Sequence, residues 1–217
     1  MEIQLNNLLD KFDDLQKKFG DKNLNSIYGA GCTKKPDIFF IFMNPTGKNI
    51  ASDKNRSGLQ APRLGTKNIR KLFSKIGIIS EDIFDKIYSM KAIDRKSDFC
   101  LDLYTGLAKD KIYITNLAKC TQMDARHLHD SVFKEYLELI HREIDIINPR
   151  KIICFGNQVS SILLGKNIKV SEYQKDEYEE LKIKNKTYKI YPSFYPVGQG
   201  MRNMDKAVIR IKNIINI

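Results

Sequence analysis

A short apolar run that ends in a polar turn constrains this chain more than any other stretch. Residues 38–43 contain no polar side chain, are rich in β-branched and aromatic residues, and are too few to span a membrane. These properties predict a strand buried on both faces of a sheet. The polar turn 44–47 follows at once, so the Asn44 carboxamide is expected beyond the carboxyl end of a central strand, where open α/β sheets bind ligands. The same residue types are also common in turns without a function.

The rest of the chain alternates strand and helix patterns. Apolar residues at helical spacing predict helices within residues 3–19, 66–77, 80–90, 128–147, 157–164 and 205–217. Apolar runs predict buried strands within 111–118 and 151–155, and alternation predicts a hairpin at 179–190. A tight turn at Gly156 joins a strand to a helix, which is typical of the α/β class. Residues 48–65 show no period, and a loop of that length is usually functional or disordered.

Length and charge narrow the class of protein. The 217 residues suffice for one well-filled core and contain no linker-like stretch, so a single domain 1–217 is expected, with residues 1–20 as a packing helix. A formal net charge of +11, spread along the chain, favours a polyanionic partner such as DNA, although a composition rich in Lys, Ile and Asn also produces basic proteins without one. Without a membrane-length apolar run or a signal-peptide pattern, a cytoplasmic protein with no membrane partner is predicted.

The cysteines give no sign of a metal site. Cys32, Cys100, Cys120 and Cys154 are far apart and include no Cys-x-x-Cys pair. Such spacing does not indicate a structural zinc ion or a cluster, so no metal and no cofactor are expected.

Three distinctive polar segments follow one another along the chain: residues 43–47 (Met-Asn-Pro-Thr-Gly), 113–120 (Tyr-Ile-Thr-Asn-Leu-Ala-Lys-Cys) and 192–196 (Pro-Ser-Phe-Tyr-Pro). Their order and context resemble the uracil-DNA glycosylase superfamily from roughly residue 36 to the C-terminus. The first segment is most similar to the mismatch-specific and single-strand-selective branches. The resemblance implies a three-layer α/β/α fold with a central four-stranded parallel sheet, which holds an extruded deoxynucleotide at its strand ends.

The resemblance also implies a set of site residues. Asn44 matches the asparagine that positions the attacking water, and Asn116 matches the asparagine that reads the uracil edge. Met43 and Pro45 flank Asn44 in the same substrate-binding turn. Tyr195 stands where the family has a catalytic histidine, and its hydroxyl can donate a hydrogen bond to a base oxygen, although it is longer than imidazole.

One further segment departs from the family pattern, and another is similar to a single branch of the family. Residues 61–65 lie where several relatives place an aromatic residue that stacks on uracil, so Arg63 is expected to stack on the base or to meet a phosphate. Residues 115–120 are similar to the Thr-Asn-x-x-Lys-Cys segment of the iron-sulfur branch. Of that branch's four ligands only Cys120 clearly matches, so the cluster is not expected.

Several residues are expected to contact DNA. Residues 197–203 resemble the loop that enters the duplex where the base has left, with Met201 as the wedge and Arg202 as a phosphate or groove contact. The alternative for this loop is a glycine-rich turn before the last helix. Further DNA contacts are expected from four other residues, namely Thr46, Lys48, Lys119 and Ser193.

These features predict a monomeric, monofunctional glycosylase that removes uracil or a related deaminated base from DNA and leaves an abasic site. No lysine matches a family nucleophile, so lyase activity is not expected. One alternative keeps the fold but removes hypoxanthine or xanthine. A second is a non-catalytic DNA- or nucleotide-binding module on the same scaffold. A third, a generic doubly wound nucleotide-binding protein, is less favoured because the chain has neither Gly-x-Gly-x-x-Gly nor a P-loop motif.

Overall fold

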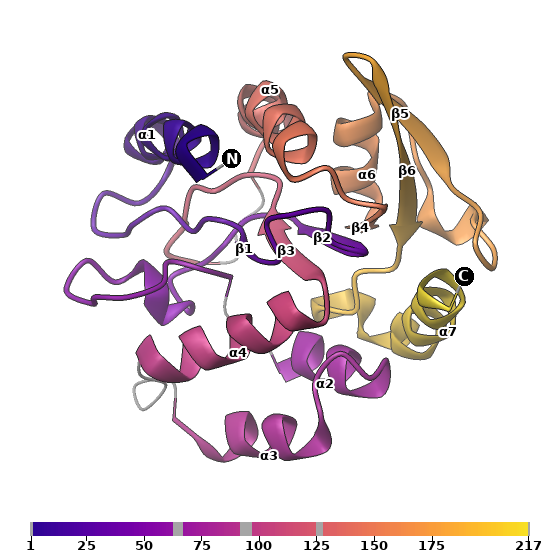
Figure 1. Ribbon diagram of the computed structural model, residues 1–217, viewed down its shortest axis with the longest axis horizontal. Coiled ribbons are helices and arrows are strands. Elements are labelled where there is room, and N and C mark those ends of the chain that lie inside the picture. The colour runs from indigo at the N-terminus through magenta and orange to yellow at the C-terminus, as the bar shows by residue number, and fades with distance from the viewer. Residues whose placement is uncertain (1, 63–66, 92–96, 125–127, 217) are drawn as a thin grey trace.

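A computed structural model describes residues 2–62, 67–91, 97–124 and 128–216. Within these residues the strands form one six-stranded sheet in the order β1-β3-β2-β4-β6-β5 (Figure 1). Their bounds are Ala30–Gly31 for β1, Ile38–Phe42 for β2, Ile112–Asn116 for β3, Lys151–Phe155 for β4, Glu179–Ile183 for β5 and Lys186–Ser193 for β6. The predicted α/β class is confirmed, and so is the hairpin, which is the antiparallel pair β5 and β6.

The sheet is mixed and larger than the four-stranded parallel sheet that the family resemblance implies. Its inner strands β3, β2, β4 and β6 run parallel to one another, whereas β1 and β5 are antiparallel edge strands. The β1 strand pairs with Tyr113 and Ile114 of β3. The sequence pattern predicts no strand at residues 30–31. Because the inner strands are parallel, their carboxyl ends lie at one edge of the sheet, and the polar segments after β2, β3 and β6 begin there.

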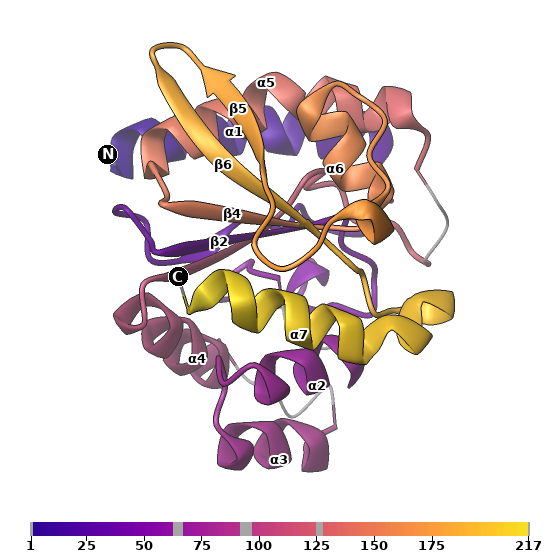
Figure 2. The same ribbon diagram turned by 90° about the vertical axis from the view of Figure 1, so that its right-hand side faces the viewer.

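Helices cover both faces of the sheet and make the molecule three-layered (Figure 2). One face carries α1 (Glu2–Phe19), α5 (Asp130–Ile147) and α6 (Asn157–Leu164). The other carries α2 (Lys67–Lys75), α4 (Ser97–Lys109) and α7 (Met204–Ile215), with α3 (Glu81–Ser89) packed outside α2. Short 3₁₀ helices occur at Ile50–Ser52, Val170–Glu172 and Gly198–Asn203. None of the helices in the described ranges has the length and apolar character that crossing a bilayer requires.

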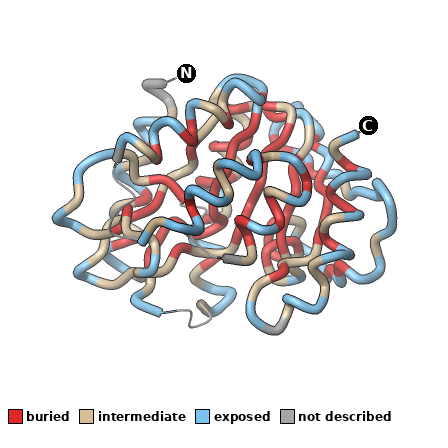
Figure 3. The backbone as a smooth tube through the Cα atoms, turned by 90° about the horizontal axis from the view of Figure 1, so that it is seen from below, coloured by how far each residue is buried: buried red, intermediate tan, exposed pale blue. Residues whose placement is uncertain are grey.

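Two apolar clusters bind these layers together. The first lies between the sheet and α1, α5 and α6, and the second between the sheet and α2, α4 and α7. Successive side chains of a strand point to opposite faces, so Phe39 and Ile41 enter the first cluster while Phe40 and Phe42 enter the second. Figure 3 shows the buried stretches of the chain in the interior of the molecule and the exposed stretches at its periphery. The β2 strand is buried on both faces, as its continuous apolar run predicts.

Local sequence signals explain where several elements begin and end. The Ser80 hydroxyl accepts a hydrogen bond from the Ile83 amide at 3.3 Å and begins α3, as predicted. The α5 helix ends at Asn148, which adopts the left-handed conformation at φ 55° just before Pro149. Gly156 has φ 90°, a value that favours glycine, and makes the tight turn from β4 into α6. Thr66, the expected N-terminal cap of α2, lies outside the described residues.

Candidate active site

The polar segments after β2 and β3 lie side by side at the carboxyl edge of the sheet. Phe42 and Asn116, the last residues of the two strands, are register partners. Beyond them the pairing continues, because the Ala118 amide donates to the Met43 carbonyl at 3.0 Å. Farther out, Gln122 exchanges backbone hydrogen bonds with the Asn44 turn, donating to the carbonyl of Pro45 at 3.2 Å. The fold therefore brings together the two predicted asparagine motifs.

Asn44 is half-buried at the turn after β2. Its side-chain amide nitrogen donates to the Pro45 carbonyl at 3.1 Å, which holds the carboxamide close to its own turn. Within the described part of the chain its side-chain oxygen has no hydrogen-bond partner. That oxygen can accept a hydrogen bond from a water molecule and orient it, but an amide cannot take up the proton as a carboxylate would.

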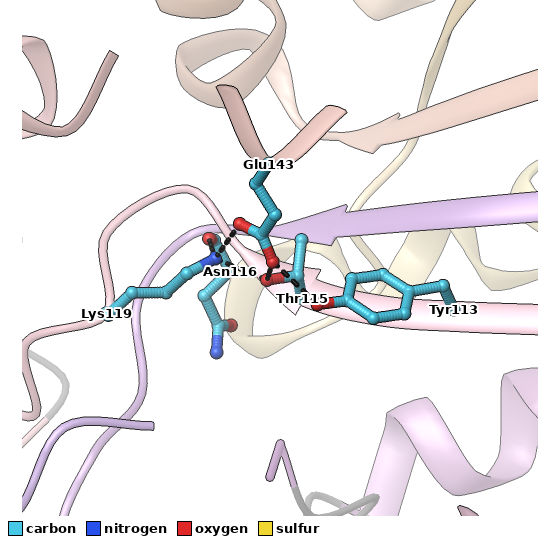
Figure 4. Close-up of polar contacts among 5 residues, drawn as sticks. All are labelled: Tyr113, Thr115, Asn116, Lys119 and Glu143. Carbon is cyan, nitrogen blue, oxygen red and sulfur yellow. Dashed lines mark hydrogen bonds and ion pairs between the residues drawn. The ribbon is translucent and has the colours of Figure 1, made fainter. Parts of the chain in front are cut away.

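Asn116 ends β3 with its side chain on the face covered by α2, α4 and α7. It follows Ile114 at the strand period of two, and Ile114 belongs to the second cluster. In Figure 4 the Asn116 carboxamide points away from Glu143, which comes from α5 on the opposite face. Asn116 is 4% exposed, and no hydrogen bond of its side chain is formed to any described residue. A buried amide without a protein partner is costly unless a ligand or water supplies one.

Tyr195 reaches the same face from the segment after β6. Its ring lies 6.0 Å from that of Phe42 and 6.1 Å from that of Phe155, so it sits over the ends of β2 and β4. The Tyr195 hydroxyl also has no hydrogen-bond partner among the described residues. Burial raises the pKa of Tyr195 to about 12, which keeps the phenol neutral and able to donate a hydrogen bond.

Ser193 was expected to contact DNA, and the structure does not support that role. The residue is fully buried at the end of β6, in register with Phe155. Its hydroxyl has no hydrogen-bond partner among the described residues. Parallel register partners point to the same face, so the Ser193 side chain lies in the interior, on the same face as Phe155. The β-strand pairing of residues 192–193 buries it, which the sequence pattern did not reveal.

Lys119 was also expected to contact DNA, and it is instead buried. The residue has no exposed surface, and its ammonium group forms an ion pair with Glu143 of α5 at 2.7 Å. Burial lowers the pKa of Lys119, against the attraction of Glu143. An ammonium group enclosed in this way cannot meet a phosphate, so the DNA contact predicted for Lys119 is wrong for this structure.

The remaining predicted residues divide between buried and exposed positions. The Met43 side chain packs against the first cluster, on the face opposite to Asn116, which leaves its backbone but not its side chain beside the site. Pro45 is buried and Thr46 half-buried in the turn after β2. Lys48 and Arg202 are exposed, and Met201 is 54% exposed in the 3₁₀ helix Gly198–Asn203. Arg63 lies outside the described residues.

A helix outside these motifs holds the second motif in place. The side chain of Gln16 in α1 accepts a hydrogen bond from the Thr121 amide at 2.7 Å and donates to the carbonyls of Asp21 at 2.9 Å and Leu24 at 3.0 Å. Gln122 donates in turn from its side chain to the Phe19 carbonyl at 2.7 Å. Gln16 interrupts the apolar stripe of α1 and is 7% exposed, which was the available signal in the sequence.

The donor set does not fit a metal cluster in the described residues. No group of three or more His, Cys, Asp or Glu side chains is placed there to hold a metal ion. Cys120 lies in the first apolar cluster, and burial raises the pKa of its thiol, which disfavours the thiolate that an iron-sulfur cluster requires.

A cavity of about 480 Å³ lies at the opposite, amino-terminal edge of the sheet. It is lined by residues at the starts of β2, β3 and β4, among them Ile38, Ile112 and Lys151. The carboxyl edge holds the polar side-chain groups of Asn116, Ser193 and Tyr195, which have no hydrogen-bond partner among the residues that the structure describes. The candidate site is therefore placed by its chemistry and not by this cavity.

Two comparisons with known proteins bear on the family of this chain. The model of the family described as the uracil DNA glycosylase superfamily matches residues 32–213. One relative, the type-4 uracil-DNA glycosylase of Sulfurisphaera tokodaii, is 26% identical over 96 residues. That alignment covers 43% of this chain and 44% of the relative, so less than half of the relative's length is matched.

Proposed function

Because the chain belongs to the uracil DNA glycosylase superfamily, we propose that it hydrolyses the N-glycosidic bond of uracil, or of a related deaminated base, in DNA. The product is an abasic site. The reaction is monofunctional, since no lysine matches a family nucleophile and the ammonium group of Lys119 is enclosed behind β3. The protein needs no cofactor and acts as a monomer in the cytoplasm.

The observation that carries this proposal is the Asn116 carboxamide. It is nearly fully buried, faces away from the ion pair behind it, and has no partner among the described side chains. A carboxamide offers one acceptor and two donor hydrogens in a plane, which matches the N3–H and O4 of uracil together. The hydroxyl of Tyr195, which is unpaired within the described ranges, lies on the same face and supplies a second donor.

The chemistry fits these groups. Breaking a nucleoside bond leaves negative charge on the departing base and positive charge on the sugar, so donors at the base and a held water beneath the sugar both lower the barrier. Asn44 orients the water, and Asn116 and Tyr195 stabilise the base. Leaving-group stabilisation supplies much of the acceleration, because an amide does not deprotonate water. Met201, Arg202, Thr46 and Lys48 contact the DNA, and Arg63 stacks on the base or meets a phosphate.

The test is a uracil-containing oligonucleotide with a labelled end, followed by alkaline cleavage at abasic sites. The protein is prepared from cells without their own uracil-DNA glycosylase and offered single-stranded, U·G and U·A substrates. We expect strand cleavage after alkali but none without it, no loss of activity on adding a chelator, and a steep fall in activity as salt screens phosphate contacts.

A result with no abasic product on any of the three substrates would contradict the uracil assignment. Excision of hypoxanthine or xanthine alone would change the assigned substrate. Such a substrate is the alternative because Tyr195, in place of the family's histidine, can reshape the pocket. DNA binding without excision would favour a non-catalytic module.

The pH dependence of the reaction tests the role of Tyr195. Its hydroxyl has a pKa raised to about 12, so it stays protonated and the rate should show no loss at the ordinary tyrosine pKa of about 10. The variant Tyr195→Phe is expected to lower kcat/KM about tenfold or more at every pH. The measurement is kcat/KM for both proteins from about pH 6 to about pH 10.5. Activity that disappears with an apparent pKa of about 10 in wild type alone would contradict the assignment.

A further inference from the structure

A buried ionic cluster lies directly behind the end of β3, on the face covered by α1 and α5 (Figure 4). Glu143 of α5 is 2% exposed and Lys119 is fully buried. One carboxylate oxygen of Glu143 accepts from the Lys119 ammonium group at 2.7 Å. The other accepts from the hydroxyls of Tyr113 at 2.8 Å and Thr115 at 3.1 Å. Every partner of Glu143 in this cluster therefore comes from β3 or from the segment that follows it.

The cluster is attached to the backbone of Asn116. The Lys119 ammonium group donates to the main-chain carbonyl of Asn116 at 2.7 Å and also bonds the Thr115 hydroxyl. The neighbouring strand β1 pairs with Tyr113 and Ile114 and stops short of Asn116. The ammonium group thus takes the place that a strand amide would take beside this carbonyl.

A gain in stability does not by itself explain why Lys119 and Glu143 form a buried ion pair. Enclosing two charges costs several kcal/mol per ion, and well-packed neutral side chains of similar volume are often as stabilising or more so. A buried charged pair instead fixes one geometry, because neither ion tolerates separation from its partner. Here the geometry that is fixed belongs to the residue whose carboxamide faces the candidate site.

We propose that Lys119 and Glu143 are positioning residues that hold the Asn116 backbone, and through it the carboxamide on the opposite face, against the base. This inference rests on the proposed function. Clamping the carbonyl on one side of the strand fixes the direction of the Asn116 side chain on the other. A misplacement of about 1 Å is enough to cost about 10²-fold in rate. Neither residue touches the substrate.

The test uses a neutral replacement that keeps the fold but removes the clamp. In the double variant Lys119→Met with Glu143→Gln no charge is buried, and the glutamine oxygen still accepts from Tyr113 and Thr115. The matched control is Phe133→Leu, which loosens the same α5 packing at a fully buried residue that makes none of the cluster's hydrogen bonds. The single variant Lys119→Met, which leaves Glu143 buried without its cation, is included to show what breaking the pair does to folding.

We expect the double variant to keep a melting temperature close to wild type while kcat for excision falls at least tenfold and KM for DNA stays within threefold. Phe133→Leu should keep kcat within threefold. The Asn116 side-chain amide signals in ¹⁵N NMR spectra, assigned with Asn116→Leu, should shift or broaden in the double variant and not in the control. Should wild type excise no base at all, the function fails and the NMR comparison still decides the positioning. Unchanged Asn116 signals, or a double variant as active as wild type, would overturn the inference.

Discussion

Replacing Asn44 with alanine is expected to lower kcat for base excision by a factor of about 10² to 10³, with little change in DNA affinity. The side-chain oxygen of Asn44 has no partner among the described residues and is free to orient a water molecule, and alanine removes it. The amide of Asn44 makes a single described hydrogen bond, to the carbonyl of the next residue, so the cost to folding is small. Single-turnover excision measures the rate, and DNA binding by fluorescence anisotropy measures the affinity.

A second variant, Asn44→Asp, tests whether the residue at this position only orients the water or also accepts its proton. A carboxylate at this position can take a proton, and general-base catalysis contributes about 10²-fold or more. Asn44→Asp is therefore expected to be at least as fast as wild type near neutral pH and to lose rate as the carboxylate is protonated. Equal rates for wild type and Asn44→Ala would remove Asn44 from the reaction.

Replacing Arg210 with alanine is expected to lower the free energy of unfolding by about 3 to 5 kcal/mol. Arg210 of α7 is 4% exposed and donates to four main-chain carbonyls: those of Pro192 at 2.7 Å, Gln174 at 2.9 Å, Lys175 at 2.8 Å and Glu177 at 2.7 Å. Its guanidinium group therefore joins α7 to the loop before β5 and to the end of β6. Alanine leaves these carbonyls without their donor.

Urea denaturation followed by circular dichroism measures this effect. The matched control is Arg150→Ala, which removes a 70% exposed arginine paired with Asp37 at 3.1 Å and should cost no more than about 1 kcal/mol. Arg210→Lys keeps the charge but loses the planar guanidinium group. Its loss of unfolding free energy is expected to lie between those of Arg210→Ala and Arg150→Ala. A loss below about 1 kcal/mol for Arg210→Ala would mean that the four contacts contribute little.

Local sequence patterns predicted most of the fold because apolar residues recur at regular helix or strand spacing in most of its elements. The continuous apolar run of β2 and the stripe of α5 each determined an element. Asn148 marked the end of α5, and Gly156 marked the turn from β4 into α6. The α4 helix was missed although Cys100, Leu103, Tyr104 and Leu107 recur at helical spacing and are buried. The two-residue strand β1 has too short a pattern to be seen, because only its pairing with β3 defines it.

The sequence predicted the positions of site residues that directly follow strand ends. It gave a wrong role to Lys119, whose ion-pair partner is far away in the sequence. Asn116 and Tyr195 lie on one face because strand order and alternation place them there. Lys119 looked like a surface lysine because its partner Glu143 is 24 residues away on α5. A carboxylate within the buried stripe of α5, between Ile140 and Ile144, was the sign that a cation had to be enclosed with it.

The α1 helix lies before residue 32, where the match to the family model begins, yet its Gln16 supports the Thr121 amide in the segment after Asn116. Part of the scaffold under this segment is thus supplied by residues outside the matched range. Chimeras that graft the motifs of a relative onto this chain must therefore exchange Gln16 and the loop it supports as one unit. Transplanting the matched region alone would separate the asparagine motif from its brace.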